Sequence, residues 1–134
     1  MVLKIYTDGG SKGNPGPSSI GGVGYIDKKK VFEFKKSIGI ATNNDAEYQA
    51  LITALKFVKL RTTNYELQPK KIQFFSDSRL MVNQVNGFFK VKNGKIKEYI
   101  LIIRGLEQEI GLPISYHLVP REQNVEADLL VNSV

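Results

Sequence analysis

The sequence predicts an α/β fold built on one mixed sheet, with helices packed against its faces. Three strand-like segments joined by short turns come first, and helical periodicity then alternates with two further strand-like segments. The 134 residues are about one domain in length, since domains commonly run ~100–150 residues. No internal repeat, low-complexity tract or linker divides the chain, so we expect a single domain over residues 1–134.

The first third of the chain is expected to form an antiparallel meander. Val2–Thr7, Ser18–Asp27 and Val31–Ile38 carry the β-branched and aromatic residues typical of strands. A Gly-rich stretch separates the first two segments, and the short connection Asp27–Lys30 suits a hairpin turn. Among the glycines, those at positions 21, 22 and 24 fit a flexible hairpin.

The hydrophobic pattern changes to a helical period after Asn44. One helix face then collects Ala46, Ala50, Leu51, Ala54, Leu55 and Val58, with Thr42 or an adjacent asparagine available as N-cap. The remaining expected elements are a buried strand at Lys70–Ser76, a short helix at Arg79–Asn86, a helix at Lys97–Ile110, a strand at Ile114–Val119 and a helix from Asn124 to Val134. The inward side of the Lys97–Ile110 helix is expected to comprise Ile100, Leu101, Ile103, Leu106 and Ile110.

The composition limits the chemistry that the chain can perform. There are 19 Lys and Arg against 13 Asp and Glu, and the net charge of +6 suggests a polyanionic partner. With no cysteine and one histidine, disulfides, thiol nucleophiles and Cys- or multi-His-ligated metals are excluded. Any metal must be held by oxygen, which favours Mg²⁺, Mn²⁺ or Ca²⁺.

The sequence predicts no contact with a membrane. No apolar run approaches the ~18 residues of a spanning helix. The segment Met1–Asp8 reaches an acidic residue too soon to hold the apolar core of a signal peptide. We therefore expect a cytoplasmic location.

Three acidic residues stand where a plain soluble fold would not place them. Asp8 and Asp77 each follow a predicted strand, and if these strands are parallel neighbours both carboxylates lie at the same sheet edge. Turn formation and helix capping are the alternatives for each. Glu47 falls within the apolar stripe of the first helix, where a buried carboxylate needs a cation or several donors. Its alternative is partial exposure near the helix start, where the macrodipole favours an acid. Asp128 lies beside apolar positions in the last helix and would be unremarkable alone.

Four segments together resemble type 1 ribonuclease H, in the family's order and over nearly the whole chain. They are Tyr6–Pro17, Thr42–Glu47, Ser76–Ser78 and Val119–Asn124 with Ala127-Asp128. The chain resembles a variant without the basic protrusion and with a Pro120-Arg121-Glu122 loop, as in archaeal and some bacterial members. The resemblance implies a single ribonuclease H domain with a five-stranded mixed sheet of order 3-2-1-4-5 and flanking helices.

The same resemblance implies an endoribonuclease that hydrolyses the RNA strand of RNA–DNA hybrids and leaves 5′-phosphate and 3′-hydroxyl ends. Two Mg²⁺ ions, with Mn²⁺ as an alternative, would activate the water and stabilise the leaving oxygen. By resemblance Asp8 is the ligand shared by both ions. Glu47 and Asp77 serve the leaving-group ion, and Asp128 serves the ion on the nucleophile side.

Several polar and basic residues match positions that touch nucleic acid in the family. The amides of Asn14, Asn43 and Asn44 match contacts to the minor groove, where amides can recognise 2′-hydroxyls. The remaining expected contacts are Gly9, Gly10, Thr42, Ser78, Arg79, Lys90 and Lys92. Many relatives carry a histidine in the loop before the last helix, where this chain offers Arg121 or Glu122 as auxiliaries. His117 lies earlier, in the last strand, and is expected to be structural. We expect the protein to be a monomer and its partner to be an RNA–DNA hybrid duplex.

Other functions share or mimic this pattern. An actin-like kinase would need two lobes, which 134 residues do not supply. A retroviral-type integrase or transposase would need a late acid such as Glu107 or Glu109, but both fall on the outer side of the expected helix. A non-catalytic hybrid-binding module remains as the alternative, although it would gain nothing from carboxylates facing phosphate.

Overall fold

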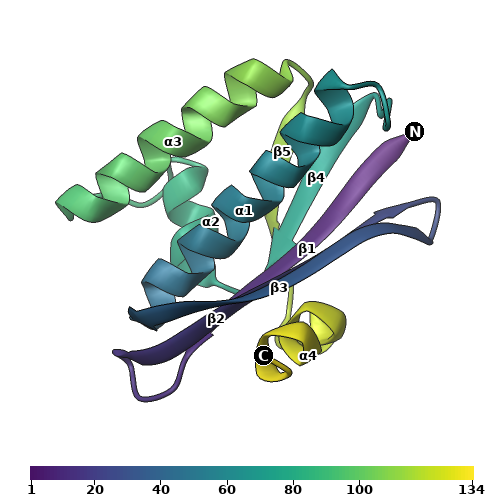
Figure 1. Ribbon diagram of the computed structural model, residues 1–134. Coiled ribbons are helices and arrows are strands. Elements are labelled where there is room, and N and C mark those ends of the chain that lie inside the picture. The colour runs from purple at the N-terminus through teal and green to yellow at the C-terminus, as the bar shows by residue number, and fades with distance from the viewer.

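Five strands form one mixed sheet in the order β3-β2-β1-β4-β5, and helices cover both of its faces (Figure 1). The computed structural model describes residues 1–134. Its elements are β1 Val2–Ser11, β2 Gly16–Ile26, β3 Lys29–Ala41, α1 Asn43–Thr63, β4 Lys71–Ser76, α2 Arg79–Val85, α3 Gly94–Ile110, β5 Ile114–Leu118, the 3₁₀ turn η1 Arg121–Gln123 and α4 Val125–Asn132. This confirms the predicted α/β class, the element order and the strand order.

The sheet is antiparallel on one side of β1 and parallel on the other. β1 pairs antiparallel with β2 and β2 with β3, as the meander predicts. β1 pairs in parallel with β4, and β4 with β5. The turn between β2 and β3 is only Asp27 and Lys28, both in the left-handed region that tight hairpins require. β1 ends later and β2 begins earlier than predicted, and β3 is longer at both ends, because β2 pairs with β1 on one side and with β3 on the other.

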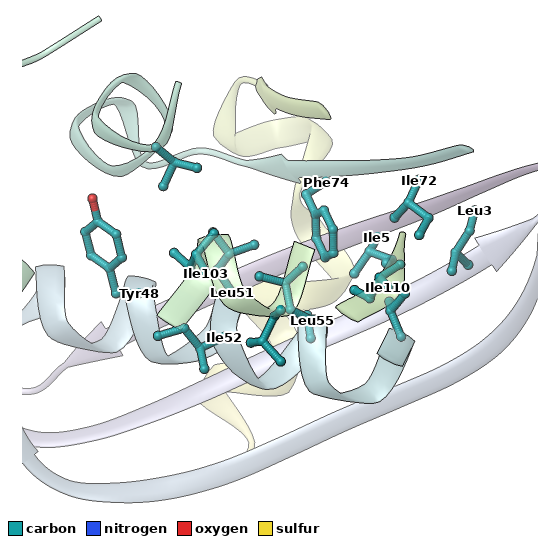
Figure 2. Packing of buried hydrophobic residues seen from close by; sticks show 14 of the residues in the cluster. Leu3, Ile5, Tyr48, Leu51, Ile52, Leu55, Ile72, Phe74, Ile103 and Ile110 are labelled. Carbon is teal, nitrogen blue, oxygen red and sulfur yellow. The ribbon is translucent and has the colours of Figure 1, made fainter. Parts of the chain in front are cut away.

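The main core lies between the sheet and the helices α1 and α3 (Figure 2). Leu3 and Ile5 of β1 and Ile72 of β4 pack there against Leu51 and Leu55 of α1. All six residues of the predicted α1 face are buried, which confirms that face. On α3 the prediction for Leu101 is wrong, because this side chain is 72% exposed. The face that packs inward is formed by Ile96, Ile103, Leu106 and Ile110.

Helix α4 covers the opposite face of the sheet from α1, α2 and α3 (Figure 1). It packs on β1 and β2. None of the helices is both long and apolar enough to cross a membrane.

Two glycines of β2 make room for aromatic rings rather than forming the flexible hairpin that we expected. A Cβ atom at Gly22 would lie 2.4 Å from Cε2 of Phe34, and one at Gly24 would lie 2.5 Å from Cε2 of Phe32. Both glycines pair with β1 and β3, and a register shift in the β2–β3 pairing follows Gly24. Their lack of a side chain therefore lets the phenylalanines of β3 lie across β2.

Candidate active site

Asp8 and Asp77 emerge at the same end of two adjacent parallel strands. The parallel register of β1 and β4 runs as far as Tyr6 opposite Phe75, and each acid comes two residues later. Asp77 follows the end of β4, as predicted. Asp8 does not follow the end of β1, because β1 continues to Ser11 through its pairing with β2. The expected juxtaposition holds nonetheless, since the parallel pairing alone brings both residues to this edge.

Glu47 reaches these acids because the first turn of α1 crosses β1 at Gly9. A Cβ atom on Gly9 would lie only 2.3 Å from the carbonyl carbon of Ala46, so no other residue fits there. The Gly9 backbone N–H donates a hydrogen bond of 2.9 Å to Oε1 of Glu47. The Glu47 side chain is buried, at 9% exposure. The predicted carboxylate in the apolar stripe is therefore confirmed, and partial exposure at the helix start is wrong.

A capping box fixes the start of α1 and with it the position of Glu47. The Thr42 hydroxyl accepts a hydrogen bond from the Asp45 backbone N–H at 3.1 Å, and Asp45 accepts from the Thr42 backbone in return. Burial opposes ionisation of Asp45, but the hydrogen bonds from Thr42 and the charge of Lys95 outweigh it and lower its pKa. In this structure Thr42, which the sequence analysis assigned as a nucleic-acid contact, is the N-cap of α1.

The three carboxylates crowd one another. Asp8, Glu47 and Asp77 each offer an oxygen, and these oxygens lie within 4.8 Å of one another. Burial, then the charge of Asp77 and the contact with Asp128, raises the pKa of Asp8 to about 7. Burial, then the charges of Asp8 and Asp77, raises the pKa of Glu47 well above its ordinary value. The protein alone leaves this negative charge largely uncompensated, which is the condition that a divalent cation relieves.

Asp128 joins the same hollow from the other face of the sheet. This hollow of about 520 Å³ is lined by all four predicted acids and by Arg121, among other residues. Asp128 lies outside the group of three whose oxygens are within 4.8 Å. A Cβ atom on Gly21, the residue opposite Asp8 in β2, would lie 2.9 Å from Cβ of Leu130. The bare backbone at Gly21 therefore lets α4 seat Asp128 beside Asp8.

Asn124 is a positioning residue that the sequence analysis missed. Its side chain is 1% exposed, and its backbone carbonyl accepts a hydrogen bond of 3.1 Å from the Asp128 N–H. We expected the last helix to start at Asn124, and a helix-start asparagine normally caps its helix. Here its side chain makes no capping bond and instead reaches β1.

Only one of the two predicted loop auxiliaries lies at the acids. The Nε atom of Arg121 is 3.6 Å from Oδ2 of Asp77, although the Arg121 side chain is 84% exposed. Glu122 lines a different hollow, of about 830 Å³, between the start of α4 and the side chains of β1 and β2. His117 stacks on the ring of Phe75 and shares a 2.7 Å hydrogen bond with the Ser115 hydroxyl, which fits the expected structural role.

The predicted nucleic-acid contacts gather in part. The Asn43 backbone N–H donates to Oδ1 of Asn14 at 2.8 Å, and Oδ1 of Asn43 accepts from the Ser11 N–H at 2.8 Å. These bonds tie the β1–β2 connection to the start of α1, beside the acids. Asn44 follows at the same helix end and is partly exposed, and Gly9 and Gly10 line the acidic hollow. The Ser78 hydroxyl caps α2 by accepting from the Met81 N–H.

Two basic residues of the set lie elsewhere. Lys90 and Lys92 are exposed in the segment before α3, and neither lines the acidic hollow. That helix begins at Gly94 rather than at the predicted Lys97, because Oδ1 of Asn93 accepts from the N–H groups of Lys95 and Ile96.

The sequence and the fold of this chain are similar to those of known proteins. The RNase H family profile matches residues 2–104. A bifunctional protein of Mycobacterium tuberculosis is 39% identical over 98% of this chain, which spans only 35% of that protein's length. Ribonuclease HI of Halobacterium salinarum is 36% identical over 97% of this chain, and the match covers 62% of that protein's length. LC11-RNase H1, isolated from compost and crystallised with an RNA/DNA hybrid, superposes with a TM-score of 0.90 at 39% identity, covering 98% of this chain and 95% of that one.

Proposed function

The chain belongs to the RNase H family, in its type 1 branch, and from that premise we propose that residues 1–134 form one domain that hydrolyses the RNA strand of RNA/DNA hybrids. The observation that carries the proposal is the meeting of Asp8, Glu47 and Asp77, from three separate elements, within 4.8 Å. A module that only bound the hybrid would be weakened by this negative charge beside phosphate. The expected monomeric state and cytoplasmic location belong to the same proposal.

The residues of the site fit Mg²⁺. The close group consists of three carboxylates, the hard oxygen ligands that Mg²⁺ prefers, and no sulfur or imidazole lines the hollow. Burial and the neighbouring acids raise the pKa values of Asp8 and Glu47, and a divalent cation bound here would offset that crowding of negative charge. We propose that Asp8, Glu47, Asp77 and Asp128 hold two Mg²⁺ ions, with Mn²⁺ as a substitute. When bound, the ions supply a water of lowered pKa and neutralise charge on the reacting phosphate.

The resemblance to the family implies a part for each carboxylate. Asp8 is central, since it lies in contact with Asp128 and within reach of Glu47 and Asp77, so we assign it to both ions. Glu47 and Asp77 are assigned to the leaving-group side, and Asp128, reached from α4, to the side of the attacking water. The Gly9 N–H orients Glu47, so that one oxygen of this carboxylate remains free for a ligand. By the same resemblance, hydrolysis would leave a 5′-phosphate and a 3′-hydroxyl.

Recognition of the hybrid is assigned to the surface around the start of α1. Asn14, Asn43 and Asn44 are held there beside the acids and would recognise 2′-hydroxyls on successive nucleotides. The backbone at Gly9 and Gly10 allows close approach of a sugar–phosphate chain. Thr42, Ser78 and Arg79 would add contacts to phosphate or sugar, and Lys90 and Lys92 would attract the duplex at longer range.

Cleavage of an end-labelled hybrid tests the proposal directly. We expect cleavage of the RNA strand in Mg²⁺ but not in EDTA, no cleavage of double-stranded DNA or double-stranded RNA, and little cleavage of a DNA duplex with a single embedded ribonucleotide. The variant Asp8→Asn, purified in parallel, should bind the hybrid and not cleave it. Activity of this variant within about tenfold of wild type, ~1.4 kcal/mol in activation free energy, would reject the role of Asp8. Hybrid binding without cleavage by the wild type would favour the non-catalytic alternative.

A further inference from the structure

Helix α4 carries Asp128 but has few apolar contacts to hold it on the sheet. It is eight residues long, and only Ala127 and Val131 among its side chains are buried. Val125 and Leu129 are 52% and 63% exposed. A helix this short is marginal in water and depends on its contacts with the rest of the protein. The position of α4, and of Asp128 with it, must therefore be fixed largely by polar contacts.

Two lysines of the edge strand β3 make such contacts at the two ends of α4. Near the start of the helix, Nζ of Lys30 lies 2.6 Å from Oε1 of Glu126. Just past its last turn, Nζ of Lys35 donates to the Ser133 hydroxyl at 3.1 Å and lies 3.5 Å from the Ser133 carbonyl oxygen. A lysine at this end also interacts favourably with the helix dipole. Because β2 lies between β3 and β1, both lysines reach across β2 to the helix.

The pleat of β3 turns these two lysines toward α4 and their neighbours away from it. Directly paired residues lie on the same face of a sheet, and Lys35 pairs with Gly21, on which α4 packs. Lys29 and Lys36, which stand next to Lys30 and Lys35 in the sequence, pair instead with isoleucines that pack beside α1. Both are exposed and take part in no ion pair. They are therefore matched controls of equal charge on the opposite face.

We propose that Lys30 and Lys35 are positioning residues that clamp α4 from both ends and so hold Asp128 beside Asp8. The inference rests on the proposed function, in which Asp128 serves the ion beside the attacking water. Neither lysine lines the acidic hollow, so the clamp acts through α4 and not by contact with an ion or the reacting phosphate. A loosened helix would hold Asp128 in place for less of the time. Turnover should then fall while affinity for the hybrid stays the same.

Hydrogen exchange of the α4 backbone tests the clamp without any cleavage. The amides of residues 128–132 would be followed in Lys30→Gln and Lys35→Gln, with Lys29→Gln and Lys36→Gln as controls. Each clamp variant should lower the protection of these amides by about two- to fivefold, the range that one exposed charged contact supports, and should leave the amides of β4 unchanged. The controls should exchange as wild type does. Wild-type protection of α4 in both clamp variants would overturn the proposal.

Steady-state cleavage separates positioning from binding of the hybrid. At half-saturating Mg²⁺, Lys30→Gln and Lys35→Gln should each lower kcat by about two- to fivefold and leave KM for the hybrid unchanged. A raised KM with an unchanged kcat would identify the lysines as phosphate contacts and overturn the clamp. Lower protection of α4 with an unchanged kcat would also overturn it, because the helix would then be held by the lysines without positioning Asp128 for the reaction.

Charge reversal provides a rescue at the Lys30 end. Lys30→Glu should lower kcat more than Lys30→Gln does, because it places two acids together. Adding Glu126→Lys exchanges the charges of the pair and should recover about half of the lost kcat and of the lost protection. Recovery is incomplete because a basic residue at a helix start opposes the dipole. No recovery of either would overturn the contact. A wild type that cleaves no hybrid would remove the proposed function itself, while the exchange measurements would still decide whether the lysines hold α4.

Discussion

The side-chain amide of Asn124 donates a hydrogen bond of 2.9 Å to the backbone carbonyl of Thr7, the residue before Asp8 in β1. Asn124 also accepts the first backbone hydrogen bond of α4, from Asp128. One buried residue therefore connects the strand that carries the first acid to the helix that carries the fourth. The relative position of Asp8 and Asp128 depends on this connection and on the bare backbone at Gly21.

Replacing Asn124 by alanine should cost both stability and activity. The variant leaves the Thr7 carbonyl without its partner, and an unsatisfied buried polar group costs about 1–3 kcal/mol. Hybrid cleavage should fall further than stability explains, because α4 loses its anchor. Asn86→Ala is the matched control, since it removes an exposed side-chain bond to the Tyr116 carbonyl. Urea unfolding and initial cleavage rates measure the two effects, and equal behaviour of both variants would contradict the positioning role.

Two glycine-to-alanine changes should act in opposite directions. At Gly21 the new methyl group would meet Leu130 and Ala127 and push α4 off the sheet, which should destabilise the protein by about 1–3 kcal/mol and reduce cleavage. At Gly105, inside α3, nothing lies within 4 Å, and the change should stabilise the protein by about 0.5–1 kcal/mol through helix propensity. Thermal or urea unfolding of the two variants measures both changes in stability. A stabilising Gly21→Ala would show that α4 does not pack against this residue.

The four acids should differ in their effect on metal binding. The oxygens of Asp8, Glu47 and Asp77 form the close group, and Asp128 lies outside it. In wild type, Mg²⁺ at a hundredfold excess over its Kd should stabilise the fold by about 2.7 kcal/mol. We expect Asp128→Asn to keep most of this stabilisation by Mg²⁺ but to lose hybrid cleavage. Asp77→Asn should lose most of the stabilisation and most of the cleavage. Melting curves across a Mg²⁺ titration measure the stabilisation. Its loss in Asp128→Asn would mean that Asp128 binds the same ion as the close group of Asp8, Glu47 and Asp77.

Much of the site could be predicted because local patterns encode it. The period of α1 alone predicts Glu47 in the buried stripe, and a parallel pairing of the strands that carry Asp8 and Asp77 predicts both acids at one sheet edge. The burial of Asn124 could not be predicted, because it depends on how η1 and α4 dock onto β1, far away in the sequence. Leu101 was assigned to the wrong face because residues 100–103 are all apolar, and a continuous run does not tell which side of a helix packs inward.

The end of β1 and the position of Arg121 could not be predicted from the sequence for a similar reason. β1 extends past Asp8 only because β2 offers a partner as far as Ser18 opposite Ser11, and pairing partners are not visible in either segment alone. Arg121 and Glu122 were equivalent candidates in the sequence. The 3₁₀ turn of η1 separates them, since it places Arg121 at the acids and Glu122 toward a different hollow.

The pH dependence of stability should reveal the crowded carboxylates when no metal is present. The pKa of Asp8 is raised from 3.8 to about 7 in the folded protein, so between these values the folded state holds a proton that the unfolded state has lost. Its contribution to stability is therefore fully present below about pH 4 and is lost as pH rises through about 7. Glu47 acts in the same direction. At ~1.4 kcal/mol per pKa unit, the contribution of Asp8 is at most about 4 kcal/mol.

Asp8→Asn should accordingly melt higher than wild type in EDTA at pH 8, because it removes a buried charge from the cluster. The advantage should shrink toward pH 5, where wild-type Asp8 is protonated when folded, and it should also shrink in saturating Mg²⁺, which compensates the charge in wild type. Differential scanning calorimetry at pH 5 and pH 8, with EDTA or Mg²⁺, gives the four comparisons. A melting temperature of Asp8→Asn at or below that of wild type in EDTA at pH 8, with no Mg²⁺ shift in wild type, would mean that the acids do not share one site.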